Sequence, residues 1–235
     1  MDLTDKVVVI TGGGRGVGRS IALALAREGA RLVLAARTES ELNAVHDEVK
    51  ALGAEAIVVP TDVADPPHIE HMAKVTLDTF GTVDVVINNA GTGTVLAPVQ
   101  DTTLEYWESM MNTNARSAFL VTKAFLPTLL EKRSGHVINI SSVVAKKGVA
   151  TASAYCASKA AMAAFGESLA AEVSAQGIRV SNLFCGPINT WLRWAATPDF
   201  PRDGVVEPED IAQAVVGVLK LKDYVLVDEI PVRRL

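Results

Sequence analysis

The fold of this chain is constrained most by a regular alternation of short, β-branched apolar runs with longer segments of helical periodicity. The runs expected to be strands are nearly continuous in Val, Ile and Leu, which is typical of strands buried on both faces of a parallel sheet. The alternation therefore predicts an α/β fold, a doubly wound parallel sheet of the Rossmann type with helices on both faces. The expected strand and helix pairs are 6–11 with 18–28, 31–36 with 40–52, 56–59 with 67–80, 83–87 with 104–131, 136–140 with 154–176 and 178–183 with 209–221, followed by a last strand at 224–227.

The length of the chain fits a single domain, because one α/β core of 235 residues can bury most of its apolar surface. Within residues 1–235 we expect a glycine-rich, cofactor-binding half over about 1–92 and a catalytic and substrate half over about 93–235. The segment 185–206 has no clear period, and loops of that length are usually functional or mobile.

Charge and composition exclude several classes of function. The net charge is −5 and the basic residues are scattered, so no nucleic-acid-binding surface is expected. The start of the chain is acidic and no apolar run approaches the roughly eighteen residues of a membrane span, so we expect a cytoplasmic protein that does not enter a membrane. Cys156 and Cys185 are too few for a disulfide framework or a zinc site. His68 and His71 lack a third ligand, so they are interpreted as surface histidines and no metal site is predicted.

A glycine-rich turn follows the first predicted strand, where residues 11–18 read Thr-Gly-Gly-Gly-Arg-Gly-Val-Gly and open a helix. Free backbone N–H groups at such a helix start can hold a dinucleotide pyrophosphate. Glycine suits the position because the turn needs backbone angles that a Cβ opposes, and because a side chain would hold the phosphate away from the amides. The predicted cofactor contacts in this turn are Gly12, Gly14, Arg15, Gly16, Val17 and Gly18.

Two other interpretations of this turn stay open. Glycines also gather in tight strand-to-helix turns that bind nothing. In addition, residues 13–20 differ by one residue from a P-loop, because Arg19 stands where the phosphate-reaching Lys belongs. Nucleotide hydrolysis is therefore the weaker alternative.

The choice of dinucleotide is predicted at the end of the second strand. An acidic residue there would hold the ribose hydroxyl of NAD, whereas this chain has Arg37. A guanidinium can grip a 2′-phosphate, and Arg15 can assist from the glycine turn, so NADP is the expected cofactor. The alternatives are that Arg37 is only a solvated charge and that Asp62, after the third strand, is a loop carboxylate instead of an adenine contact.

Tyr155 and Lys159 form the candidate catalytic pair. They are four residues apart in a predicted helix and so share one face. An ammonium beside a phenol favours the phenolate, so we expect Lys159 to lower the pKa of Tyr155, which could then exchange a proton with a carbonyl oxygen. Ser142 follows the fifth strand at the sheet edge where sites form and could hold the same oxygen. Ser142 could equally be a capping or turn serine, as could Ser141.

Together these residues resemble the short-chain dehydrogenase/reductase family across nearly the whole chain, in particular members that reduce 3-oxoacyl thioesters or simple carbonyls. The resemblance rests on the glycine turn, Asp62-Val63, 88–91 (Asn-Asn-Ala-Gly), Asn114, Ser142, Tyr155 and Lys159. It implies that Asn114 anchors a water in a proton relay to Lys159 and that Lys159 also holds the nicotinamide ribose. It further implies cofactor contacts from Val63, Asn89, Ala90, Gly91, Gly186, Pro187, Ile188 and Thr190.

The resemblance predicts an NADP(H)-dependent oxidoreductase that interconverts a carbonyl and an alcohol, with Tyr155 as general acid and base. The substrate is expected to be a small carbonyl or alcohol, or an acyl thioester, and the assembly a homo-dimer or homo-tetramer. A catalytically idle NADP(H) sensor is the alternative. Apolar residues that could line the substrate pocket, or serve only in packing, are Val149, Phe184, Trp191, Leu192 and Trp194.

Two segments depart from the family pattern. The sixth strand is followed by Cys185-Gly186-Pro187 where the family usually has Pro-Gly, which removes a fixed φ and places a thiol near the nicotinamide end. The chain ends 227–235 without the usual Asp-Gly-Gly segment. The orientation of the loop after the sixth strand is therefore an open question at this point.

Overall fold

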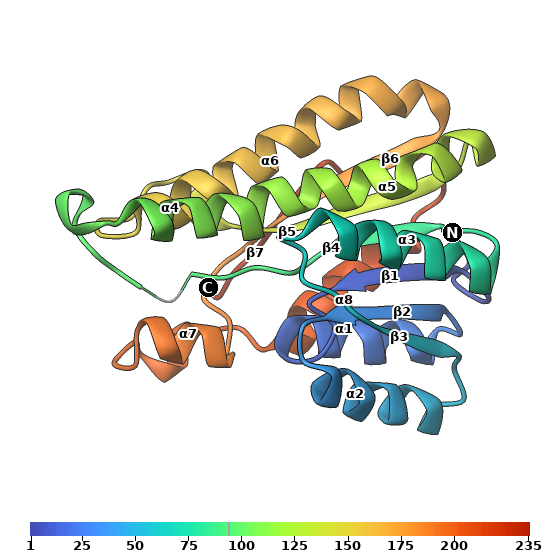
Figure 1. Ribbon diagram of the computed structural model, residues 1–235, viewed down its shortest axis with the longest axis horizontal. Helices are drawn as coiled ribbons and strands as arrows, with labels where there is room; N and C mark the ends of the chain where they lie inside the picture. Colours follow the sequence, from blue (N-terminus) through green and yellow to red (C-terminus); the bar gives the residue numbers. More distant parts are fainter. Residues whose placement is uncertain (94) are drawn as a thin grey trace.

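The computed structural model describes residues 1–93 and 95–235 and is built on one seven-stranded sheet (Figure 1). The strand order is β3-β2-β1-β4-β5-β6-β7 and all neighbouring strands are parallel, which confirms the doubly wound α/β fold. The order reverses between β1 and β4, the place where such sheets bind their ligands. The strands are β1 Val7–Thr11, β2 Arg31–Ala36, β3 Ala56–Pro60, β4 Val85–Asn88, β5 Gly135–Ser142, β6 Ile178–Cys185 and β7 Glu229–Val232.

Helices cover both faces of the sheet. One face packs against α1 (Gly16–Arg27), α2 (Glu39–Ala51) and α8 (Pro208–Leu219). The other packs against α3 (Pro66–Phe80), α5 (Ser117–Lys132) and α6 (Ser153–Val173). Two short helices, α4 (Leu104–Met110) and α7 (Trp191–Ala196), complete the set, and Figure 1 shows α7 outside the two layers, beyond the carboxyl ends of the strands.

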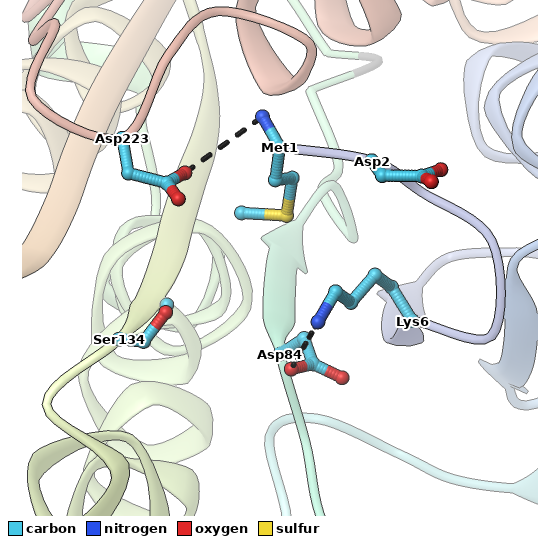
Figure 2. A pocket seen from close by; sticks show the side chains of 7 residues that line it. Met1, Asp2, Lys6, Asp84, Ser134 and Asp223 are labelled. Carbon is cyan, nitrogen blue, oxygen red and sulfur yellow. Dashed lines mark ion pairs between the residues drawn. The ribbon is translucent and has the colours of Figure 1, made fainter.

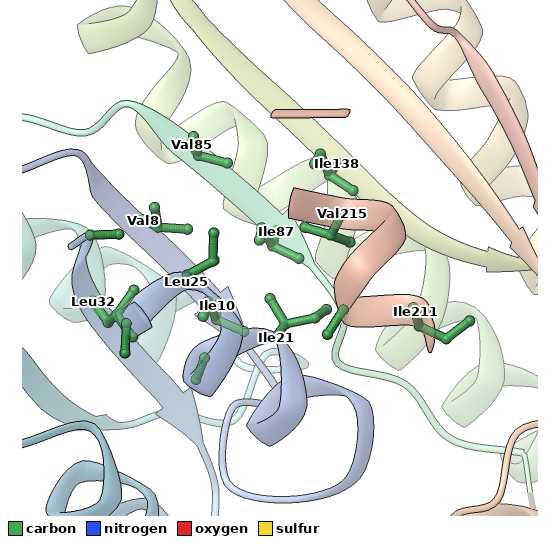
Figure 3. Close-up of a cluster of buried hydrophobic side chains, with 14 of the residues drawn as sticks. Val8, Ile10, Ile21, Leu25, Leu32, Val85, Ile87, Ile138, Ile211 and Val215 are labelled. Atoms are coloured by element: carbon green, nitrogen blue, oxygen red, sulfur yellow. The ribbon is translucent and has the colours of Figure 1, made fainter. Parts of the chain in front are cut away.

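The central strands explain why their sequences lack polar alternation. Val8 and Ile10 of β1 point to one face and join the cluster with Ile21 and Val215, which Figure 3 shows between strands and helices. Val7 and Val9 point to the opposite face and join the second cluster. Since both faces of the strand are covered, every residue of β1 is buried.

Two expected elements are corrected by the structure. The last strand is not 224–227 but Glu229–Val232, which pairs with β6 at the edge of the sheet. Pro231 obscured it, and an edge strand tolerates Pro because one side of the strand needs no ladder partner. The single helix expected at 104–131 is divided into α4 and α5 by a π-helical turn, Met111–Arg116. The other expected elements start and end within three residues of the observed bounds.

Candidate active site

The residues predicted to bind cofactor follow the carboxyl ends of five different strands. The glycine turn follows β1, Arg37 follows β2, Asp62 follows β3, the segment 89–91 follows β4 and the segment 186–190 follows β6. Because the strands are parallel, these ends lie along one edge of the sheet. The structure therefore brings the separate sequence motifs to a common edge.

The glycine turn is packed too closely for side chains. A Cβ on Gly18 would lie 2.1 Å from the carbonyl oxygen of Gly12, and Gly16 has a left-handed φ of +53°. Asn89 fixes the turn from β4, because its Nδ2 donates to the carbonyl oxygens of Thr11 at 2.9 Å and Gly12 at 3.2 Å. The turn is therefore a rigid backbone surface at the start of α1, which fits the phosphate cradle that a dinucleotide needs.

The two arginines expected near the cofactor phosphate have different surroundings. Arg15 Nη1 pairs with Glu41 Oε1 at 3.2 Å, and its guanidinium lies 4.6 Å from the ring centre of Trp191. Arg37 is exposed, and within the described residues it has no ion-pair partner. Of the two arginines, Arg37 is thus the one whose guanidinium is exposed and unpaired within the described residues.

The loop after β3 stabilises itself. Asp62 Oδ1 accepts from the backbone N–H of Ala64 at 2.9 Å, and the backbone N–H of Asp62 donates to His68 Nδ1 at 3.2 Å. Val63 is buried in the α3 side of the core. His68 and His71 are both exposed, as predicted for surface histidines. Among the residues that the structure describes, no group of His, Cys, Asp and Glu could hold a metal ion.

Lys159 and Asn114 converge beneath the loop that follows β4. A Cβ built on Gly91 would lie 3.0 Å from Asn114 Oδ1 and 3.4 Å from Lys159 Nζ, so both polar groups reach the same point. Lys159 is buried and its Nζ donates to the carbonyl oxygen of Ile140 at 2.8 Å. Burial lowers the pKa of Lys159 to about 8.

Asn114 lies in the π-helical turn and is fully buried. Its Oδ1 accepts from the backbone N–H of Thr92 at 2.8 Å, while its Nδ2 donates to the carbonyl oxygen of Thr92 at 3.0 Å and to Ser158 Oγ at 2.9 Å. Ser158 Oγ in turn donates to the carbonyl oxygen of Tyr155 at 2.8 Å. Asn114 therefore ties the loop after β4 to the helix that carries Tyr155.

The pKa of Tyr155 moves in the direction opposite to the one expected from the sequence. Burial raises it to about 12, and the neighbouring hydroxyl of Ser142 only partly opposes this shift. Tyr155 as a whole residue is half-buried, and Gly93 lies against its ring. The ammonium of Lys159 is engaged by the carbonyl of Ile140, and desolvation of the phenol exceeds the charge effects that favour phenolate.

The two serines at the end of β5 have separate tasks. Ser142 Oγ donates to the carbonyl oxygen of Cys185 at 3.3 Å and accepts from the N–H of Val144 at 3.4 Å, so it is a turn serine as well as a neighbour of Tyr155. Ser141 Oγ donates to the carbonyl oxygen of Lys159 at 3.1 Å and so anchors α6 to the sheet.

Comparison with known proteins agrees with this geometry. A model of the short chain dehydrogenase family matches residues 6–200. An uncharacterized oxidoreductase of Staphylococcus aureus strain USA300 is 36% identical over 231 residues, 98% of each chain. The chain belongs to the short-chain dehydrogenase/reductase family.

Solved structures of this family superpose over nearly the whole chain. An alcohol dehydrogenase of the archaeon Thermococcus sibiricus, complexed with 5-hydroxy-NADP, has a TM-score of 0.90 at 32% identity and covers 97% of this chain and 96% of its own. A metagenomic short-chain oxidoreductase in complex with NADP has a TM-score of 0.88 at 33% identity, covering 99% and 98%. The family assignment removes the P-loop alternative for the glycine turn. In the described part of the chain, each helix is too short or too polar to cross a bilayer.

The loop that departs from the short-chain dehydrogenase/reductase pattern has a defined orientation. The N–H of Gly186 donates to the carbonyl oxygen of Val232 at 2.8 Å, and the N–H of Val206 donates to that of Pro187 at 2.9 Å. Thr190 lies against the glycine turn, because a Cβ on Gly16 would be 3.4 Å from Thr190 Cγ2. The atypical last strand therefore supports this loop, and the thiol of Cys185 is buried with its pKa raised to about 12.

Sequence reasoning missed Gly93 and Ser158. A Cβ on Gly93 would lie 2.5 Å from Tyr155 Cδ2, so Gly93 packs directly against the ring of this tyrosine. The only sequence signal was a further glycine two residues beyond Gly91. Of the apolar pocket candidates, Phe184 is buried under the ammonium of Lys146 and serves in packing, whereas Trp191 and Val149 are exposed.

A cavity of about 210 Å³ lies at the opposite end of the sheet (Figure 2). Its lining comes from segments that precede β1, β4 and β5, so it faces the amino ends of the strands. Met1 N pairs with Asp223 at 3.7 Å and Lys6 Nζ with Asp84 at 3.7 Å. These charges neutralise each other far along the strands from Tyr155, and they form no part of the candidate active site.

Proposed function

We propose that this short-chain dehydrogenase/reductase is an NADP(H)-dependent enzyme that reduces a ketone, aldehyde or 3-oxoacyl group to an alcohol, and catalyses the reverse oxidation. The observation that carries the proposal is that Tyr155, Ser142, Lys159 and Asn114 lie at one edge of the sheet. The same edge bears the glycine turn, which is packed too closely to accept a Cβ at Gly18. Residues of about 1–92 would bind the cofactor, and residues of about 93–235 would supply the catalytic groups and the contacts with the substrate.

NADPH, when bound, supplies the hydride that the carbonyl carbon accepts. Tyr155 would donate its proton to the carbonyl oxygen, and its raised pKa keeps that proton in place at neutral pH. Ser142 would donate a hydrogen bond to the same oxygen and stabilise the charge that develops there. The product is the alcohol, and Tyr155 regains a proton from solvent.

Lys159 and Asn114 would support this proton transfer. Lys159 keeps its ammonium below a pH of about 8 and would hold the nicotinamide ribose, and its charge would stabilise the phenolate that Tyr155 becomes after giving up its proton. Asn114 fixes the loop over the tyrosine and would anchor a water in the relay to Lys159. The glycine turn, the segments 62–63, 89–91 and 186–190, and Arg37 would hold the rest of the dinucleotide.

The preference for NADP over NAD is supported by the exposed guanidinium of Arg37. The T. sibiricus and metagenomic structures carry NADP-type ligands, which agrees with this assignment. The proposal includes a homo-oligomer, a dimer or tetramer. It is supported by the exposed apolar side chains of Leu104, Trp107 and Phe119 on α4 and α5. Light scattering of the purified protein tests it.

The experiment is to follow NADPH consumption, with NADH as control, on a panel of ketones, aldehydes and 3-oxoacyl thioesters. We expect turnover with NADPH on at least one class and slower turnover with NADH. Tight NADPH binding with no turnover on any class would favour the alternative of a catalytically idle sensor.

A further inference from the structure

Glu41 places a carboxylate beside the glycine turn. It belongs to the first turn of α2, four residues after Arg37 at the end of β2. Its side chain rests on the turn, because a Cβ built on Gly14 would lie 3.1 Å from Glu41 Cβ and 3.5 Å from Glu41 Oε2. The carboxylate is therefore held against the main chain that is proposed to cradle the cofactor.

Arg15 is the ion-pair partner of this carboxylate. Its Nη1 donates to Glu41 Oε1 at 3.2 Å, and its guanidinium carbon lies 4.6 Å from the ring centre of Trp191. An aromatic ring against the face of a guanidinium leaves hydrogen bonding to the N–H groups in its plane. One of these groups serves Glu41, so Glu41 occupies a donor that a second anion would use.

The ribose 2′ position of a dinucleotide lies at the end of the second strand in a fold of this type. In this chain the glycine turn adjoins that strand end, because the N–H of Gly13 donates to the carbonyl oxygen of Ala35 at 3.1 Å. A 2′-phosphate bound there would meet the positive charges of Arg37 and Arg15. It would also meet the negative charge of Glu41, which contacts Arg15 directly.

We propose that Glu41 is a specificity-determining residue for the cofactor and that it acts as the counter-ion of Arg15. A 2′-phosphate must compete with Glu41 for the guanidinium, so Glu41 reduces the preference for NADP(H) that the two arginines alone would give. The ribose hydroxyl of NAD(H) carries no charge and is hardly affected. This inference rests on the NADP(H)-dependent function proposed above and deepens its choice of cofactor.

Two opposing effects of Glu41 on a bound phosphate have to be compared. Holding Arg15 in one position reduces the side-chain entropy that the arginine loses on binding. The ion pair is partly open to solvent, with 55% of the Arg15 side chain and 34% of the Glu41 side chain exposed, so it orders Arg15 only weakly. A phosphate ester carries almost two negative charges at neutral pH, so its repulsion by the carboxylate is the larger effect.

The direct test is calorimetric titration with adenosine 2′,5′-bisphosphate and with 5′-AMP, which differ only in the 2′-phosphate. Glu41→Gln removes the charge and keeps the shape that packs on Gly14. We expect this variant to bind the bisphosphate about three- to tenfold more tightly than the wild type, and 5′-AMP within about twofold of it.

Glu39→Gln is the matched control. Glu39 lies in the same first turn of α2, is exposed and has no ion-pair partner within the described residues. Its substitution should change the affinity for either nucleotide by less than about twofold. An equal gain in bisphosphate affinity in Glu39→Gln and Glu41→Gln would mean that only the net charge matters, and would contradict a specific role of Glu41.

A double-mutant cycle with Arg15→Gln tests whether Glu41 acts through the arginine. Arg37 remains in this variant and should keep binding of the bisphosphate measurable. If Arg15 carries the effect, adding Glu41→Gln to Arg15→Gln should change bisphosphate affinity by less than about twofold. The full three- to tenfold gain in both backgrounds would contradict the role of Glu41 as the counter-ion of Arg15.

Kinetics and binding together separate this inference from the proposed function. On a substrate that the wild type reduces, Glu41→Gln should lower KM for NADPH and leave KM for NADH within about twofold; a change confined to kcat would contradict the inference. Unchanged or weaker bisphosphate binding in Glu41→Gln would overturn the inference and leave the nucleotide site intact. The expected affinity changes without turnover of any substrate would support Glu41 and contradict the oxidoreductase. Failure of the wild type to bind either nucleotide would overturn the proposed cofactor site and this inference with it.

Discussion

Two parts of the proposed site, the glycine turn with its neighbours (the cofactor edge) and the α7 segment (the substrate edge), are built in different ways. The cofactor edge consists mainly of main-chain atoms. Its turn, 12–18, is fixed by its glycines and by Asn89, and the turn and Asn89 each follow a buried strand. The substrate edge is held together by side-chain contacts. In α7 and the loop after it, arginines stack on aromatic rings. A surface made of closely packed main chain tolerates no added atoms, so we expect substitutions at the cofactor edge to disturb cofactor binding. A surface made of side chains can be altered one residue at a time, so we expect the substrate edge to determine substrate specificity.

The largest effect is expected from Gly18→Ala on the cofactor edge. The added Cβ would lie 2.1 Å from the carbonyl oxygen of Gly12, so the turn must move. We expect the free energy of unfolding to fall by about 1–3 kcal/mol and NADPH binding to be lost. Denaturant unfolding and fluorescence titration with NADPH measure the two effects.

Gly217→Ala is the matched control, since Gly217 also lies in a helix and a Cβ there would meet nothing within 4 Å. This variant should be more stable than the wild type by about 0.5–1 kcal/mol and should bind NADPH normally. Equal behaviour of the two alanine variants would contradict the close packing of the turn.

The next effect is expected from Gly93→Ala, where the two edges meet. The new Cβ would lie 2.5 Å from the ring of Tyr155 and must displace it. We expect kcat to fall by about 100-fold, as for other small misplacements of a catalytic group, with little change in NADPH affinity. Steady-state kinetics with a parallel binding titration would show this separation, and a normal kcat would disprove the contact's importance.

A smaller effect is expected from Arg37→Asp. The exchange replaces an exposed guanidinium with a carboxylate that repels a 2′-phosphate and can accept a ribose hydroxyl. We expect the ratio of kcat/KM for NADPH to that for NADH to fall by about tenfold. If the ratio is unchanged, Arg37 is only a solvated charge.

The smallest effect is a pH dependence. The pKa of Lys159 is lowered to about 8 by burial, and Tyr155 keeps its proton to about pH 12. A group with a lowered pKa loses its proton as pH rises through that value, so the ammonium is half lost near pH 8. We expect reduction to be constant below this pH and to decline by about twofold there; a constant rate to pH 10 would contradict the role of Lys159.

Much of the fold followed from the sequence, because each buried strand contains apolar residues on both faces. The misplaced last strand shows the limit: Glu229–Val232 is an edge strand that contains Pro231, and its register is set by pairing with β6. The π-helical turn that holds Asn114 also leaves no periodic signal, because one extra residue hardly alters the apolar spacing.

The candidate site was predictable where short motifs determine it and unpredictable where distant segments meet. Tyr155 and Lys159 share a helix face, so their spacing identified them. Gly93 on the Tyr155 ring depends on how a loop folds over α6, and the direction of the Tyr155 pKa depends on burial, which spacing alone does not specify.

The central claim is that Tyr155 transfers the proton in an NADPH-dependent carbonyl reduction, and Tyr155→Phe tests it most directly. On a substrate that the wild type turns over, we predict that NADPH oxidation by this variant falls by at least about 100-fold while NADPH affinity and the free energy of unfolding stay close to those of the wild type. Turnover by Tyr155→Phe at the wild-type rate would contradict the account.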